Sequence, residues 1–258
     1  MVTLAESAYY SDPKRFLQVC QEMASFQREQ NGIGTLGEKT LHAVLKKYYE
    51  PDVKKHEVLV GRYVADIFTG TEIVEIQTRQ LGKLRKKLSV FLEKYPVTVV
   101  HPIIGKKWVY WVNPENGECS KGRVSPKHGN VFDAFYELYQ IKPFLVGKGM
   151  TLRIPIVSVQ EYKYLNGWSR DKKRGATWID RIPVEMEKEI VLRTVEDYAK
   201  LIPDKLDREF TCKEFAQYAG ISAERAQNVV PILYFVGSLC RVGKRGRAYI
   251  YVRNQEFL

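Results

Sequence analysis

The sequence has few of the features that mark membrane or secreted proteins. No apolar run in its 258 residues approaches the roughly 18 residues needed to cross a bilayer. Its first residues, Met-Val-Thr-Leu-Ala-Glu-Ser, lack the basic start and apolar stretch of a secretory signal. We therefore expect a soluble, cytoplasmic protein that has no membrane partner.

Cysteine and histidine are scarce and scattered. The four cysteines form no C-x-x-C pair, and the four histidines form no H-x-x-x-H pair. This spacing argues against a structural zinc site and implies no disulfide framework.

Acidic residues are outnumbered by basic ones. The chain carries 41 Lys and Arg against 30 Asp and Glu, which gives a formal net charge of +11. Because 45% of the residues are hydrophobic, the chain can bury a sizeable core. The basic surplus suits a polyanionic partner such as nucleic acid.

The first hundred residues have clear secondary-structure signals. Asp12-Pro13 is typical of a helix start, and a helical apolar stripe follows up to about Gln30. Further along, apolar spacing and turn residues predict the order α-β-β-β-α-β, which is one mixed sheet with helices against it. The expected ranges are 36–49, 56–60, 63–68, 73–78, 81–94 and 97–100.

The rest of the chain predicts the end of the first domain, a linker and a second domain. In the first domain we expect a hairpin at 107–125, a helix at 131–139 and a strand at 152–159, and a polar, basic segment then indicates the linker. After the linker we expect helices that begin at Pro183, Thr211 and Ser222, then two strands near 239–242 and 248–252. The predicted boundaries are a first domain at 1–165, a linker at 166–182 and a second domain at 183–258.

The second predicted hairpin brings carboxylates together. If Gly70 and Thr71 form a two-residue loop, Asp66 lies directly opposite Glu75, and opposed residues share a face. Gln77 joins the same face. Apolar neighbours surround both carboxylates, so their charges are unfavourable unless something compensates them.

A divalent cation is one such compensation. Oxygen ligands without His or Cys favour Mg²⁺ or Mn²⁺, and Glu38 can add a third carboxylate from the preceding helix. The alternative is that Asp66 and Glu75 line a solvated sheet face, with Glu38 as a partner of the helix dipole.

With these residues in this order, the segment from Gly32 to His101 resembles the PD-(D/E)XK nuclease superfamily. The resemblance implies a restriction-endonuclease-like core in which Asp66, Glu75 and the backbone carbonyl of Ile76 bind the metal. Gln77 would position the attacking water, and Glu38 would support a second ion or the water network. Gln77 stands where the family usually has lysine, a variation that some restriction enzymes share. Unlike lysine, the amide of Gln77 cannot supply positive charge or act as a base.

The C-terminal pattern, three helices followed by a hairpin with a basic tip, resembles a winged helix-turn-helix domain. The resemblance implies that the helix after Ser222 contacts base edges through Arg225, Gln227 and Asn228. The wing would contact phosphates or the minor groove through Lys244, Arg245 and Arg247. Winged helices also serve as dimerisation or protein-docking modules, which is the alternative.

Together these patterns predict a mixed α+β (α/β) protein: a restriction-endonuclease-like domain followed by a winged-helix domain. The expected function is that of a magnesium- or manganese-dependent DNA endonuclease acting on duplex DNA, and a homodimer would explain cleavage of both strands. The alternative is a DNA-binding or regulatory protein whose nuclease fold is catalytically silent.

Overall fold

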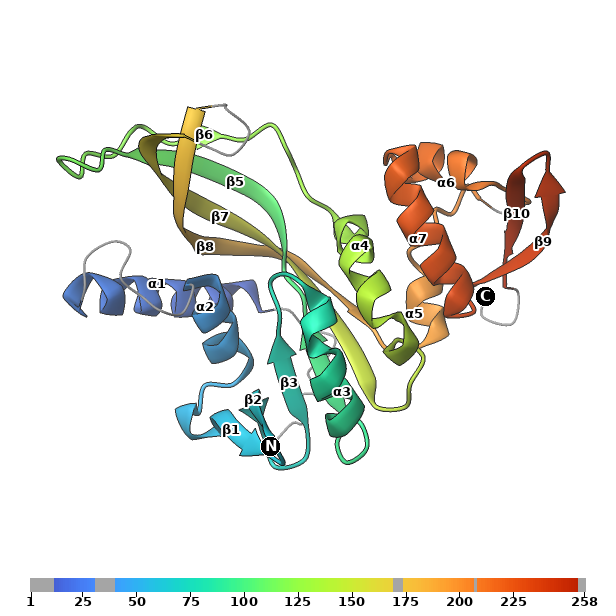
Figure 1. Cartoon of the computed structure of the whole chain (residues 1–258), viewed down its shortest axis with the longest axis horizontal. Helices are drawn as coiled ribbons and strands as arrows, with labels where there is room; N and C mark the ends of the chain where they lie inside the picture. The colour runs from blue at the N-terminus through green and yellow to red at the C-terminus, as the bar shows by residue number, and fades with distance from the viewer. Residues whose placement is uncertain (1–11, 31–39, 169–173, 207, 255–258) are drawn as a thin grey trace. The chain divides into compact units, whose positions relative to one another are not determined.

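The computed structural model describes residues 12–30, 40–168, 174–206 and 208–254 (Figure 1). The chain is mixed α+β and forms two compact units that interleave along the sequence. The described parts of 1–58, 102–130 and 155–189 belong to unit 1. Those of 59–101, 131–154 and 190–258 belong to unit 2. Within the described residues, no helix is both long and apolar enough to span a membrane.

The sheet of unit 2 holds the strands that the sequence predicted most clearly. Strands β2 (Tyr63–Phe68) and β3 (Ile73–Ile76) are antiparallel, and β3 pairs in parallel with β4 (Val97–Val100). The first residues of β7 (Met150–Trp168) pair in parallel with β4, and β1 (His56–Val60) flanks β2. All residues of β3 and β4 are buried, as their apolar sequences predict.

Short helices supply further core residues of unit 2. The expected helix at 81–94 is a 3-10 turn, η3 (Leu81–Leu84), that leads into α3 (Arg85–Phe91). The expected helix at 131–139 is divided between η4 (Val131–Ala134), α4 (Phe135–Leu138) and η5 (Tyr139–Phe144). Several of their apolar residues are fully buried, among them Leu81, Leu88, Phe135 and Leu138.

The C-terminal part of unit 2 begins with the end of β8 (Arg174–Leu192) and α5 (Val195–Ala199). Helices α6 (Cys212–Ala219) and α7 (Ala223–Phe235) follow, and then the antiparallel strands β9 (Leu239–Arg245) and β10 (Ala248–Arg253). The sequence signals at the helix ends are confirmed. Thr211 and Glu214 form a capping box, Gly220 ends α6 with a φ of 63°, and Ser222 caps α7.

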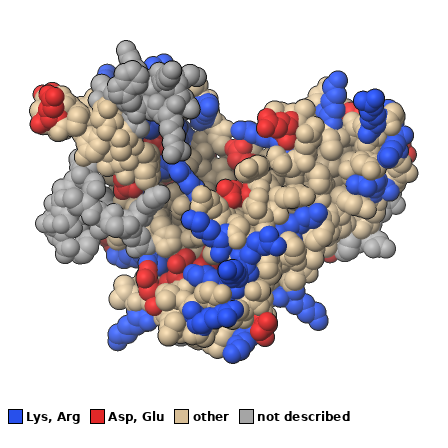
Figure 2. Space-filling view, in the orientation of Figure 1, with Lys and Arg blue, Asp and Glu red and all other residues tan. Residues whose placement is uncertain are grey.

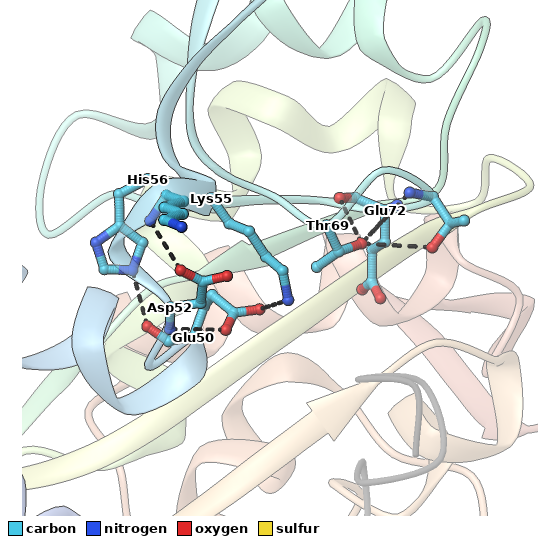
Figure 3. A network of polar contacts seen from close by, with 8 residues as sticks. Glu50, Asp52, Lys55, His56, Thr69 and Glu72 are labelled. Atoms are coloured by element: carbon cyan, nitrogen blue, oxygen red, sulfur yellow. Dashed lines mark hydrogen bonds and ion pairs between the residues drawn. The ribbon is translucent and has the colours of Figure 1, made fainter. Parts of the chain in front are cut away.

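Unit 1 contains α1 (Pro13–Gln30), α2 (Thr40–Tyr49) and a short 3-10 turn, η2 (Val53–Lys55). Phe16 of α1 packs edge-on against Tyr48 of α2, with ring centroids 5.3 Å apart. After α2, Glu50 accepts hydrogen bonds from the amide of Asp52 and from Lys55 Nζ, and its carbonyl contacts the ring of His56 (Figure 3). These contacts stabilise the turn that leads into β1.

The sheet of unit 1 is built on the long strands β7 and β8, which pair with each other. Strand β5 (Ile103–Val112) pairs in parallel with β7 and antiparallel with the short β6 (Arg123–Val124). The hairpin expected at 107–125 therefore has only a two-residue return strand.

Two expectations are wrong in this region. Residues 166–168 and 174–182 belong to β7 and β8 rather than to a linker, and β8 also replaces the helix expected from Pro183. Asn166 joins the two strands by contacts to the amide and hydroxyl of Thr177. The sequence after Pro183 is rich in Glu, Met and Lys, which favour helix, but strand pairing overrides this propensity. The expected boundaries at 165 and 183 accordingly fall inside paired strands.

Candidate functional site

The β2–β3 hairpin sets the position of the two carboxylates. Gly70 has a φ of 97°, and the amide of Thr69 donates to the carbonyl of Glu72 over 3.0 Å. The amide of Glu72 donates to Thr69 Oγ1 over 3.1 Å (Figure 3). The strand pairs next to this turn have the register that the sequence predicts. One further step along the same register brings Asp66 opposite Glu75.

At this pair of residues, hydrogen bonds from backbone amides to the two carboxylates connect β2 and β3. Asp66 Oδ2 accepts a hydrogen bond of 2.7 Å from the amide of Ile76, and Glu75 Oε1 accepts one of 3.4 Å from the amide of Asp66. Each side chain thus binds the backbone of the opposite strand. Hydrogen bonds of this kind favour the charged form of a carboxylate, so the hairpin holds two potential anions side by side.

Glu75 lies in the less favourable environment of the two. Only 1% of its surface is exposed. Burial raises its pKa, the charge of Asp66 raises it further, and the ion pair with Lys87 opposes both effects. The result is a pKa of about 7 for Glu75, well above the ordinary value of 4.5. Glu75 can therefore exchange a proton near neutral pH, which is a property common in functional sites.

Lys87 is a member of the site that the sequence did not reveal. Its Nζ lies 2.8 Å from Glu75 Oε2, and about a quarter of its side chain remains exposed. The basic residues between Lys83 and Lys87 have the sequence pattern of the solvated face of an amphipathic helix, but Lys87 instead pairs with the buried Glu75. Lys87 lies beside the inward-facing Leu84 and Leu88, and this spacing was the signal that could have identified it.

Gln77 does not face the carboxylates. Its side-chain amide donates to the carbonyl of Arg79, and among the described contacts it reaches neither Asp66 nor Glu75. The backbone of Gln77 is held by β4, because its amide donates to Val100 and its carbonyl accepts from His101 Nδ1 over 2.6 Å.

His101 accompanies this segment as a buried group. Burial lowers its pKa below the ordinary value, so a neutral ring fixes the main chain after Glu75.

The third expected carboxylate, Glu38, lies outside the described residues. Within the described ranges no group of three or more His, Cys, Asp and Glu side chains could hold a metal ion. Asp66 and Glu75 nevertheless have the chemistry for Mg²⁺ or Mn²⁺, since both present oxygen atoms and each disfavours the charge of the other.

The residues expected to read bases lie at the start of α7, in unit 2. The apolar stripe of this helix, which includes Val229 and Leu233, is buried as predicted. Gln227 is exposed, and Asn228 Nδ2 donates to the carbonyl of Glu224 over 3.3 Å.

Arg225 is also exposed, yet its Nη2 lies 2.9 Å from Asp133 Oδ1. Contact with DNA would have to compete with this ion pair.

The residues of the expected wing lie at the end of β9 and in the turn that follows it. Lys244 Nζ lies 4.8 Å from the centroid of the Tyr249 ring, and Arg245 forms an ion pair of 2.9 Å with Glu214. Arg247 is exposed in the turn. The wing is therefore basic, but one of its three cations is neutralised by α6.

Unit 1 contains a separate cluster around the buried Glu161. Lys107, Lys163 and Arg181 lie 3.1, 3.1 and 2.7 Å from its oxygens. Burial alone would raise the pKa of Glu161, but the three cations, Arg181 foremost, outweigh burial and lower it to about 2. Glu161 thus holds three like charges together on the strands of one sheet.

The family model described as "Domain of unknown function (DUF8091)" matches residues 39–193, which is more than half of the chain. The chain belongs to the DUF8091 family. It is also similar to a protein of Treponema pallidum (strain Nichols) named "Uncharacterized protein", with 28% identity over 221 residues. That similarity covers 85% of this chain and 86% of the Treponema protein. No solved structure matches the chain.

The DUF8091 match includes the candidate site, because Asp66, Glu75 and Lys87 all lie within it. It ends at Arg193, before α5, so the C-terminal helices and hairpin lie outside the matched domain. The similarity to the Treponema protein is longer than the matched domain and therefore extends beyond it.

Proposed function

We propose that this protein is a magnesium- or manganese-dependent DNA endonuclease of the PD-(D/E)XK type. The observation that carries the proposal is the juxtaposition of Asp66 and Glu75 with Lys87. Two adjacent carboxylates and a lysine are the groups that metal-assisted phosphodiester hydrolysis requires. Lys87 provides from α3 the positive charge that Gln77, directly after β3, cannot provide.

Asp66 and Glu75 would hold the ion, with the carbonyl of Ile76 as a further ligand. When bound, Mg²⁺ supplies Lewis-acid chemistry that lowers the pKa of water and neutralises charge on the phosphate. Lys87 stabilises the negative charge that develops on the phosphate, and the raised pKa of Glu75 sets the working pH. Gln77 orients water only after its amide leaves the Arg79 carbonyl.

The C-terminal elements supply DNA affinity in this proposal. Helices α6 and α7 and the β9–β10 hairpin follow the order of a winged helix, and Arg225, Gln227, Asn228, Lys244, Arg245 and Arg247 lie on them. Figure 2 shows Lys and Arg side chains spread over the face in view, which suits a polyanion. Cleavage of both strands by one site per chain implies a homodimer, which sedimentation of the DNA complex would reveal.

Cleavage of supercoiled plasmid and linear duplex with Mg²⁺ or Mn²⁺ tests the proposal. We expect nicking or cutting by the natural protein, loss of it in Asp66→Asn, and full activity in Glu93→Gln, which changes an exposed carboxylate of unit 2. Cleavage that persists in Asp66→Asn would refute this site.

A second function is favoured by one observation: the amide of Gln77 contacts Arg79 instead of the carboxylates. If the natural protein binds duplex DNA in a salt-sensitive manner but cuts nothing with either ion, the protein is a DNA-binding or regulatory protein with a silent nuclease fold. Salt-insensitive binding would contradict both functions, because phosphate contacts release counterions.

A further inference from the structure

Unit 2 exposes several aromatic rings close to cations. Tyr139 is 54% exposed, and Tyr234, Tyr249 and Phe235 are each close to 40% exposed. Such rings are usually buried, so a group of them on one unit marks an interaction surface. We call the set Tyr139, Lys142, Tyr234, Phe235, Arg241 and Tyr249 the aromatic–cation surface.

Each ring of this surface is in contact with a cation. Lys142 Nζ lies 4.4 Å from the centroid of the Phe235 ring and 5.4 Å from that of Tyr139. The Arg241 guanidinium lies 3.7 Å from the centroid of Tyr249 and 4.7 Å from that of Tyr234.

Tyr234 and Phe235 are consecutive residues at the end of α7, so they connect the two groups. The two groups of rings and cations therefore meet at the end of α7.

The cations of the aromatic–cation surface are not neutralised by acidic side chains of the described residues. Among the described residues, no Asp or Glu oxygen lies within 4.0 Å of Lys142, Arg241 or the neighbouring Lys244. Charged surface in view on the C-terminal elements, at the right of Figures 1 and 2, is mainly Lys and Arg. Stacking on the rings restrains the long side chains, which reduces the entropy lost when they meet an anion.

We propose that the aromatic–cation surface binds single-stranded nucleic acid. Unpaired bases stack on exposed rings, and cations between the rings contact the phosphates that connect those bases. A protein partner would also favour exposed aromatic residues, but a row of cations without acidic partners complements a polyanion. Duplex DNA fits less well, because its bases are already stacked and offer no free face to the rings.

This site goes beyond the proposed nuclease. It lies on η5, at the C-terminal end of α7 and on β9 and β10, whereas the residues expected to read bases lie at the start of α7. The expected wing residue Lys244 borders it through Tyr249. Binding at the surface requires no cleavage and no metal ion, so it is measured in the Asp66→Asn chain without Mg²⁺.

Fluorescence anisotropy with labelled 20-nucleotide oligo-dT, oligo-rU and a hairpin duplex tests the proposal in the full chain. We expect both single strands to bind more tightly than the duplex, and any preference between them identifies DNA or RNA as the ligand. Tyr249→Leu removes a ring and should weaken single-strand binding roughly five- to 150-fold, as loss of one stacked base does. Tyr249→Phe retains the ring and should bind as before.

The charges have their own signature and control. Lys142→Gln and Arg241→Gln should each lower the slope of log affinity against log salt by about 0.7, the value for one phosphate contact of a single strand. Lys94→Gln changes an exposed lysine of unit 2 that is not part of the aromatic–cation surface, and it should leave the slope unchanged.

Absence of oligonucleotide binding overturns the proposal and makes the surface a protein-docking site. Equal losses of single-strand affinity in Tyr249→Phe and Tyr249→Leu overturn it as well. Equal changes of the salt slope in Lys142→Gln and Lys94→Gln do the same. Circular dichroism of every variant confirms that the fold is retained. Because none of these readouts depends on cleavage, failure here leaves the nuclease proposal to its own test.

Discussion

The proton on Glu75 makes the stability of the protein depend on pH in an unusual direction. In the unfolded chain Glu75 releases its proton near its ordinary pKa of 4.5, whereas in the folded chain it keeps the proton up to about pH 7. Between these values the folded state binds a proton that the unfolded state has lost. Raising the pH across this window therefore favours unfolding.

The size of the effect follows from the pKa difference. A pKa raised from 4.5 to about 7 corresponds to a loss of about 3 kcal/mol of stability from Glu75 between pH 4.5 and pH 7. His101 acts in the opposite direction in part of the window, because its pKa is lowered by burial and protonation at low pH opposes folding. The charge of Asp66 contributes to the raised pKa of Glu75, and the ion pair with Lys87 opposes it.

Comparison with Glu75→Gln isolates this contribution, because the variant retains His101, Asp66 and Lys87. We expect the free energy of unfolding of Glu75→Gln, measured in urea, to gain about 3 kcal/mol relative to the natural protein as the pH rises from 4.5 to 8. Glu93→Gln serves as the exposed control and should run parallel to the natural protein.

Mg²⁺ should stabilise the natural protein more at pH 8 than at pH 5, since the ion competes with the proton for the same oxygens. Parallel pH profiles for the natural protein and Glu75→Gln would refute the assignment of a raised pKa to Glu75. A magnesium effect that is equal at both pH values would refute competition at this site.

Three further predictions concern ion pairs. Lys87→Gln removes the cation that lowers the pKa of Glu75, so the pH optimum of cleavage should move upward and the turnover should fall by about 100-fold; an unchanged pH profile would contradict a role for Lys87. Asp133→Asn frees Arg225 and should tighten duplex DNA binding about two- to fivefold in anisotropy at low salt, unless Arg225 makes no DNA contact, in which case affinity stays constant. Glu161→Gln should lower the free energy of unfolding at pH 7 by about 3 kcal/mol, because the pKa of Glu161 in the folded state is lowered to about 2. This difference should vanish as the pH falls from 4.5 toward 2, and a difference that persists in acid would contradict the lowered pKa of Glu161.

The parts of the fold that follow from local rules could be predicted from the sequence. The glycine-led turn at Gly70 sets the register of β2 and β3, and hence which carboxylates meet. The caps at Thr211 and Ser222 set the starts of α6 and α7 in the same way. In each case the determining contacts span only a few residues.

The parts that depend on distant contacts could not be predicted. The sequence predicted the first part of β7, at 152–159, but the rest of β7 and all of β8 contain polar and helix-favouring residues, and only their pairing makes them strands. Arg225 and Asp133 are far apart in sequence, and an ion pair between flexible side chains leaves no periodic signal. Lys87 was missed for a related reason, since its helical spacing places it near the buried side of α3 but does not indicate Glu75 as its partner.

The interleaving of the two units has a consequence for how the chain acquires its structure. The chain passes between the units after Val58, His101, Asn130, Ile154 and Glu189. On a ribosome, unit 1 cannot close until residues up to Glu189 have emerged, and unit 2 must wait for the C-terminal elements. Long loops must therefore close, with a loss of chain entropy, before the contacts that offset this loss can form. We therefore expect slow folding and a need for chaperone protection of the nascent chain.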